Sequence, residues 1–165
     1  MTNQDVAKTI NINDNLPTFS LSGINGVGEE KIYTNNDFLG KALVIYFYPK
    51  DDTPGCTKES CNFNALLPQI QNKANIIGVS ADSIASHKKF QQKYGLKFPL
   101  LSDTETVLAK VLGAYKESIV EKLITKGIKR TTFLIDKNGI IKAIWRDVKV
   151  DNHDKEVLDA VQNLN

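Results

Sequence analysis

The chain contains 165 residues, of which 41% are hydrophobic and 24% charged, enough to bury the core of one domain that we expect to span residues 1–165. Its longest apolar run, residues 42–48, is too short for a membrane-spanning helix, and residues 1–15 lack the apolar stretch of a secretory signal, so we expect a cytoplasmic protein that does not enter membranes. The 21 basic and 19 acidic residues are interspersed, and nucleic acid is therefore not an expected partner.

The first predicted strand is the run KALVIYFYP at residues 41–49, which is rich in β-branched and aromatic side chains. Its lack of polar alternation indicates burial on both faces, as in a parallel sheet. After an Asp-Asp-Thr-Pro-Gly turn, the pattern predicts a helix over residues 57–71, which Pro68 should kink or end early.

Two further strand and helix pairs follow in the middle of the chain. In the first pair, we expect a strand over residues 74–82 and a helix that is capped by Asp82 or Ser83 and ends at Gly95. In the second pair, we expect a short strand over residues 98–103 and a helix that is capped by Ser102 or Asp103 and runs to about Leu112. Strands that alternate with helices favour a parallel arrangement of these strands.

The last third of the chain predicts a hairpin and a helix. Residues 113–129 show no regular pattern, but two apolar runs within residues 130–148 are joined by Asp-Lys-Asn-Gly, and Asn-Gly between apolar runs is a strong hairpin signal. Residues 153–164 place Val157, Leu158 and Val161 at helical spacing. The whole pattern predicts an α/β fold with a mixed sheet and helices on both faces.

Both cysteines, Cys56 and Cys61, lie where the first predicted strand passes into the first helix. Ligands bind at this edge of open α/β sheets. A thiol is nucleophilic as its thiolate, which the free N–H groups in the first turn of a helix stabilise. The position therefore indicates a reactive Cys56.

The spacing of the two cysteines predicts that they are not disulfide-bonded while the helix is intact. Five positions of α-helix separate the Cα atoms by roughly 8.6 Å and the side chains by roughly 140° around the axis. A disulfide requires Cα atoms within about 7 Å. Cys56 and Cys61 can therefore bond only if the helix unwinds locally.

Several kinds of site could contain two such thiols. A structural disulfide would close a very small loop and is unexpected in a reducing compartment, and two unrelated buried thiols would not explain the clustering. A zinc site needs more ligands, and we expect His87 and His153 to be surface or helix-face residues. A Cys–His hydrolase leaves Cys61 without a role, whereas redox chemistry gives both thiols one.

The segment PKDDTPGCTKESC resembles the active-site motif of the peroxiredoxins, in particular the group called bacterioferritin comigratory protein or peroxiredoxin Q. The segments IIGVSADS, KFPLLSD, RTTFLIDKNGII and WRDVKVDNHDKEVL occur in the order that this group shows. The resemblance covers most of the chain. It implies a thioredoxin-like fold and thiol-dependent reduction of hydrogen peroxide and organic hydroperoxides.

The same resemblance implies roles for five residues. Cys56 corresponds to the peroxidatic cysteine and Cys61 to the resolving cysteine, Thr53 to the hydroxyl that binds thiolate and peroxide, Pro49 to the ring that shields the pocket, and Arg130 to the arginine that stabilises the thiolate. It further implies a thioredoxin-like thiol reductant and a monomer, with no cofactor and no metal.

The residues alone leave two other functions open. A thiol–disulfide oxidoreductase or redox sensor would use the disulfide itself and consume no peroxide, and a zinc-binding interaction domain would require bound metal. From its place one turn along the helix, Glu59 either orients Arg130 or is a solvated helix glutamate.

Overall fold

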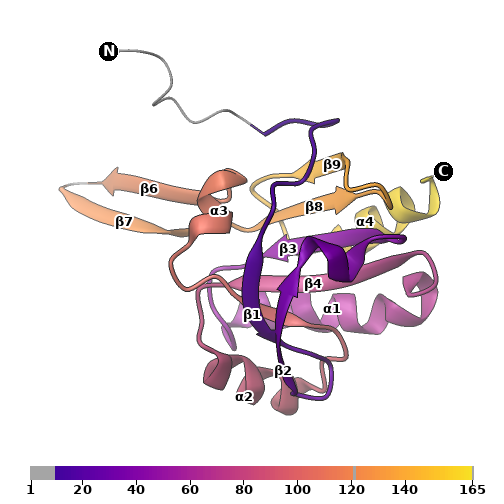
Figure 1. The fold of residues 1–165 in the computed structure, drawn as a ribbon. Coiled ribbons are helices and arrows are strands. Elements are labelled where there is room, and N and C mark those ends of the chain that lie inside the picture. Colours follow the sequence, from indigo (N-terminus) through magenta and orange to yellow (C-terminus); the bar gives the residue numbers. More distant parts are fainter. Residues whose placement is uncertain (1–9, 121, 165) are drawn as a thin grey trace.

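The computed structural model describes residues 10–120 and 122–164, which fold around a seven-stranded sheet (Figure 1). The strand order is β2-β1-β5-β4-β3-β8-β9, with β3 parallel to β4, β4 parallel to β5, and the other pairs antiparallel. The bounds are β1 (Ser20–Ile24), β2 (Glu30–Thr34), β3 (Ala42–Phe47), β4 (Ala74–Ser80), β5 (Leu100–Ser102), β8 (Thr131–Ile135) and β9 (Ile141–Trp145). The predicted mixed sheet is confirmed.

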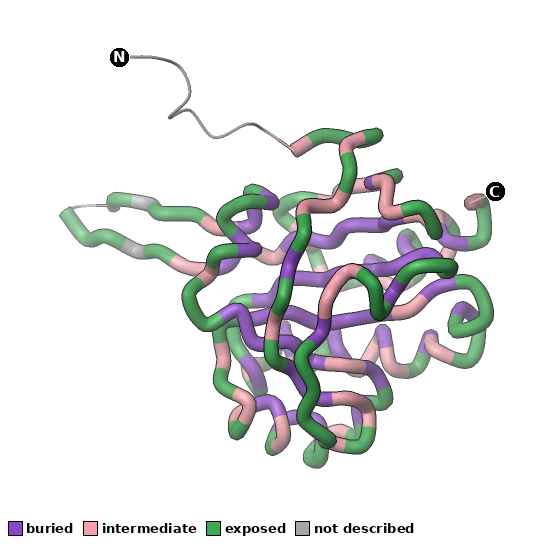
Figure 2. The backbone as a smooth tube through the Cα atoms, viewed as in Figure 1, coloured by how far each residue is buried: buried purple, intermediate pink, exposed green. Residues whose placement is uncertain are grey.

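Helices cover both faces of this sheet, as predicted. Helices α1 (Pro54–Ile70), α2 (Ile84–Tyr94) and α4 (His153–Gln162) pack on one face, and α3 (Val107–Val111) with the 3-10 helix η2 (Asn35–Phe38) packs on the other. Strand β3 alternates between the two cores, since Val44 and Tyr46 face α1 while Leu43, Ile45 and Phe47 face α3. Figure 2 shows the buried residues concentrated along these central strands.

The helix that contains both cysteines begins earlier than predicted. Helix α1 begins at Pro54, not at residue 57, because a proline is well suited to the first helical position, where its missing N–H is not needed. It ends at Ile70, so the expectation that Pro68 ends it early is wrong. Pro68 removes a single hydrogen bond in the last turn, where Leu66 and Ile70 remain buried against the sheet.

The sequence predicted the ends of α2 correctly but placed the start of α3 too early. Ser83 caps α2, its hydroxyl accepting from the Ser86 N–H, and Gly95 ends that helix in the left-handed conformation. Helix α3 begins at Val107 rather than directly after Ser102 or Asp103. The Asp103 carboxylate still binds the amino-terminal end of the helix, because it accepts hydrogen bonds from the N–H groups of Leu108 and Ala109.

Two hairpins were not predicted. Strands β1 and β2 form one edge of the sheet, and β6 (Tyr115–Val120) pairs with β7 (Leu123–Ile128) in a separate hairpin that projects from the body in Figure 1. The exposed apolar side chains Ile119, Leu123 and Ile124 lie on this projection. In the described part of the chain, no helix is both long enough and apolar enough to cross a bilayer.

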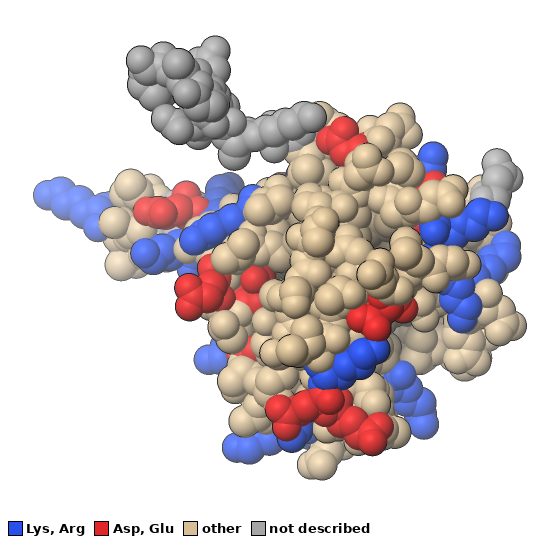
Figure 3. Space-filling model, in the orientation of Figure 1, with Lys and Arg blue, Asp and Glu red and all other residues tan. Residues whose placement is uncertain are grey.

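The surface shown in Figure 3 carries Lys and Arg interspersed with Asp and Glu, and much of its centre is uncharged. Exposed ion pairs among the described residues include Lys31 with Asp37 and Lys88 with Glu30. Exposed pairs of this kind contribute at most about 1 kcal/mol each to stability.

Candidate active site

Strand pairing brings Cys56 and Arg130 together from positions that are distant in the sequence. Strand β3 ends at Phe47, which pairs with Thr131 at the start of β8. Arg130 therefore lies beside the carboxyl end of β3, where the chain turns into α1. Cys56 is the third residue of α1, within the first turn, as the sequence predicted.

The Cys56 thiol lies against a cation. Its side chain is 1% exposed, and Arg130 Nη2 donates to Sγ over 3.4 Å. The N-terminal end of α1 adds free N–H groups and the positive end of the helix dipole. Negative charge on Sγ is therefore favoured by two independent features of the site.

Glu59 holds the same guanidinium from its other side. Glu59 Oε1 accepts from Arg130 Nη1 at 2.7 Å, and the glutamate is 2% exposed, so it is not a solvated helix residue. Burial raises the pKa of Glu59 to about 7, although the ion pair with Arg130 opposes this shift. Among the described residues, the buried Oε2 atom of Glu59 has no hydrogen-bond partner.

Thr53 precedes α1 as its N-cap residue, and its hydroxyl donates to the backbone carbonyl of Lys50 at 2.9 Å. Because the hydroxyl proton is used in this bond, the Thr53 oxygen is left as an acceptor for a further group. Pro49 is exposed and lines a pocket of about 450 Å³ together with Arg130. The remaining wall of this pocket is Lys116, Lys126, Gly127, Ile128 and Lys129.

Cys61 lies one and a half turns further along an uninterrupted helix, and both thiols are free. The Cys61 side chain is half-buried, and burial raises its pKa. Between the cysteines, the buried Ser60 hydroxyl hydrogen-bonds Tyr46 OH at 2.8 Å. The continuous helix agrees with the estimate that the two thiols are too far apart to bond in this state.

A buried polar network beside the site was missed by the sequence reasoning. Asp51 accepts hydrogen bonds from Tyr48 OH at 2.5 Å and Ser86 Oγ at 2.8 Å, and Asp51 Oδ2 lies 2.7 Å from Nδ1 of the buried His87. The histidines were expected to be surface or helix-face residues. Both lie on helices, His87 on α2 and His153 on α4, but both are buried, so they are not surface residues. Only the Tyr48–Asp51 contact is local, because Ser86 and His87 lie 35 and 36 positions from Asp51 in the sequence.

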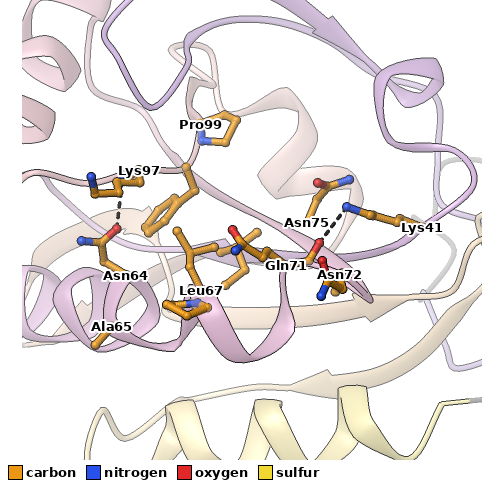
Figure 4. A pocket seen from close by; sticks show the side chains of 13 residues that line it. Lys41, Asn64, Ala65, Leu67, Gln71, Asn72, Asn75, Lys97 and Pro99 are labelled. Atoms are coloured by element: carbon orange, nitrogen blue, oxygen red, sulfur yellow. Dashed lines mark hydrogen bonds between the residues drawn. The ribbon is translucent and has the colours of Figure 1, made fainter.

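A larger pocket, of about 640 Å³, lies at the far end of α1 (Figure 4). Its side chains include Asn64, Gln71, Asn72 and Asn75, and it contains neither cysteine. Within residues 10–120 and 122–164, no three His, Cys, Asp or Glu side chains gather in a way that could hold a metal ion. The thiol chemistry is therefore concentrated at the amino-terminal end of α1.

The geometry can be compared with known proteins. The family model described as the AhpC/TSA family matches residues 12–144. The chain is 42% identical over 152 residues to a putative peroxiredoxin bcp of Coxiella burnetii, covering 91% of this chain and 97% of that protein. It is 41% identical over 160 residues to the peroxiredoxin Bcp of Bacillus subtilis, covering 94% and 98%.

Solved structures give the same relationship. The bacterioferritin comigratory protein of Xanthomonas campestris, described as having alkyl peroxide reduction activity, superposes with a TM-score of 0.81 at 42% identity, over 87% of this chain and 90% of that one. A Xylella fastidiosa PrxQ variant gives a TM-score of 0.84 at 40% identity, over 94% and 97%. These likenesses confirm the thioredoxin-like fold that the sequence resemblance implied.

Proposed function

Because this chain belongs to the AhpC/TSA family, and within it to the Bcp and peroxiredoxin Q group of thiol peroxidases, we propose a two-cysteine cycle in which Cys56 attacks peroxide and Cys61 resolves the product. Its substrates in this proposal are hydrogen peroxide and organic hydroperoxides. The observation that carries the assignment is the contact of Arg130 with the Cys56 sulfur, with Glu59 holding the guanidinium from behind.

In the first step, the Cys56 thiolate attacks one peroxide oxygen, the O–O bond breaks, and the other oxygen leaves as an alcohol or water after taking up a proton. Negative charge grows on the leaving oxygen in the transition state, and fixed donors lower the barrier. Arg130 and the free N–H groups at the start of α1 supply such donors. Thr53 Oγ, whose own proton is bound to Lys50 O, accepts the peroxide O–H. Peroxide enters by the pocket that Pro49 borders.

In the second step, the Cys61 thiol condenses with the Cys56 sulfenic acid, forming the S–S bond and releasing water. The first turns of α1 must unwind for this step, because an intact helix keeps the sulfur atoms apart. An external dithiol then reduces the disulfide by thiol–disulfide exchange. We propose a thioredoxin-like protein as this reductant.

The rest of the proposal follows from the chain as a whole. We propose one domain over residues 1–165, acting in the cytoplasm as a monomer, because a disulfide within one helix needs no second subunit. No cofactor and no metal enters the cycle, since both electrons come from the two thiols. Nucleic acid and membranes are not partners in this proposal.

The test follows the first turnover of reduced protein after rapid mixing with one equivalent of hydrogen peroxide. Cys56→Ser should consume no peroxide, whereas Cys61→Ser should complete one rapid turnover and accumulate sulfenic acid on Cys56. Equal and complete loss of the first turnover in both variants would contradict the assigned roles. Exchange with dithiols without peroxide consumption would identify a thiol–disulfide oxidoreductase, and stoichiometric zinc in purified protein would identify a metal-binding domain.

A further inference from the structure

Helix α2 holds the loop that leads into the active-site helix, through two consecutive aspartates. Asp51 is bound at the start of α2 by Ser86 and His87. Asp52, in the left-handed conformation with φ 57°, is bound at the end of α2 by Lys93 and Tyr94. Asp52 is exposed, whereas Asp51 is buried, so the Asp51 contacts are the more strongly ordering ones.

The Asp51–His87 contact needs one shared proton. His87 Nε2 lies 3.0 Å from the carbonyl oxygen of Leu101, which can only accept, so Nε2 carries a hydrogen. The 2.7 Å contact of Nδ1 with Asp51 Oδ2 then requires a second proton, on either the imidazole or the carboxyl group. In both cases the pair has no net charge, which makes its burial far less costly than that of a lone carboxylate.

This network fixes one particular peptide group. The N–H of Asp51 donates to Asp82 Oδ2 at 2.7 Å, and Ser80 Oγ binds the same Asp82 oxygen at 2.7 Å. The carbonyl of that peptide belongs to Lys50 and accepts the hydroxyl of Thr53 at 2.9 Å. The Lys50–Asp51 peptide is therefore held by its N–H and by the Asp51 side chain, while its carbonyl sets the direction of the Thr53 hydroxyl.

We propose that Asp51, His87 and Asp82 are positioning residues of the peroxidase site. They hold the Lys50–Asp51 peptide so that its carbonyl takes the Thr53 proton and leaves the Thr53 oxygen facing the peroxide. None of the three touches Cys56 in the contacts of the described residues, so they act through Thr53. The inference rests on the proposed function, because it assigns the network a role in the first turnover.

The primary test measures the second-order rate constant for Cys56 oxidation by hydrogen peroxide in Asp51→Ala. A displacement of the order of 1 Å in a reacting group can cost about 100-fold, and we expect a fall of at least about tenfold. The matched control is Asp136→Ala. The Asp136 carboxylate accepts from the backbone N–H groups of Asn138 and Ile140, and it follows β8 at the end of the strands opposite the active site. Its rate constant should stay within about twofold of the parent chain.

A double-mutant cycle separates positioning from general loss of structure. In a Thr53→Ala background, Asp51→Ala should lower the rate constant by less than about threefold, because the group that it positions is absent. Ser86→Ala, which removes one of the three bonds to Asp51, is the milder variant if Asp51→Ala does not fold. It should lower the rate constant at least about threefold with Thr53 present and not at all without it.

The outcomes distinguish this inference from the proposed function. Equal losses in the two backgrounds, or no loss in either, would overturn the positioning role while leaving a working peroxidase. A parent chain that consumes no peroxide would overturn the proposed function itself. A loss of rate that occurs when Thr53 is present and disappears in the Thr53→Ala background supports the positioning role.

Discussion

Glu59→Gln should remove a pH dependence of stability that the buried carboxyl group creates. Burial raises the pKa of Glu59 from 4.5 to about 7, with Arg130 opposing the shift. Between these two pH values the native state binds more protons at this site than the unfolded chain does. The free energy of unfolding must therefore fall as the pH rises, which is opposite in sign to the effect of an ordinary paired carboxylate.

The magnitude follows from the two pKa values. Between these two pKa values, each pH unit changes the contribution of Glu59 to the free energy of unfolding by about 1.4 kcal/mol. Because the pKa of Glu59 rises from 4.5 in the unfolded chain to about 7 in the folded one, the free energy of unfolding should fall by about 2 kcal/mol between pH 5.0 and pH 6.5. Because Glu59 is 2% exposed, solvent screening does not substantially reduce this figure. The isosteric Gln keeps the volume and a hydrogen-bond acceptor for Arg130 but cannot titrate.

The measurement is urea unfolding of the reduced protein at pH 5.0 and 6.5, for the parent chain and for Glu59→Gln. The drop in unfolding free energy between the two pH values should be smaller in the variant by about 2 kcal/mol. Glu105→Gln, at an exposed position, is the control and should behave as the parent chain does. Identical drops in the parent and Glu59→Gln would refute the argument that burial outweighs the ion pair.

Three further predictions concern helix α1 and Arg130, which contacts it. Arg130→Lys should lower the rate constant of the first turnover by about 100-fold, because an ammonium group cannot contact Glu59 and Cys56 in a fixed fork; a loss below threefold in stopped-flow mixing would contradict this. Gly55→Ala would place a Cβ 3.1 Å from Arg130 Nη2, so we expect a several-fold slower first turnover with an unchanged or higher Tm, and equal rates would show that the guanidinium position is not limiting. On oxidation, amides from Cys56 to Asn64 should lose hydrogen-exchange protection while those of α4 keep it, and unchanged protection would exclude unwinding of α1.

The sequence predicted best those elements whose signals are local. The run that forms β3 is apolar throughout because both of its faces are buried, and Ser83 and Gly95 mark the ends of α2 through their own caps. The β6–β7 hairpin escaped prediction because it pairs only with itself and projects from the body, so its sequence has no continuous apolar run. Strands β1 and β2 lie at the edge of the sheet, where exposed residues interrupt the pattern.

The residues of the candidate site likewise divide into those that a local pattern predicts and those that it does not. The position of Cys56 in the first turn of α1 could be inferred from a strand, a turn and a helix that are contiguous in the sequence. The contact with Arg130 spans 74 positions and depends on the pairing of β3 with β8, so only the family resemblance indicated it. The Asp51–His87 pair spans 36 positions and was missed, because no local pattern distinguishes a buried aspartate from one in a surface turn.

In the proposed cycle, the contacts that residues 59–63 of α1 make with the rest of the protein control how long the Cys56 sulfenic acid lasts. Unwinding α1 so that Cys61 reaches Cys56 breaks the Ser60–Tyr46 hydrogen bond and the Glu59–Arg130 ion pair, and it loosens the packing of the fully buried Phe63. Each hydrogen bond contributes about 1 kcal/mol and the Phe63 packing more, so the open form is rare in the reduced protein.

The open segment also has a structural limit. Asn64 is fixed to the loop after α2, because its side chain donates to the Gly95 carbonyl and accepts from the Lys97 N–H. Figure 4 shows the contact with Lys97. On the other side, Asp51 and Asp52 are fixed to α2. Unwinding between these anchors needs to involve only residues 53–63, which contain both cysteines. In the proposed cycle, Cys61 can therefore reach Cys56 while the contacts of Asn64 stay intact.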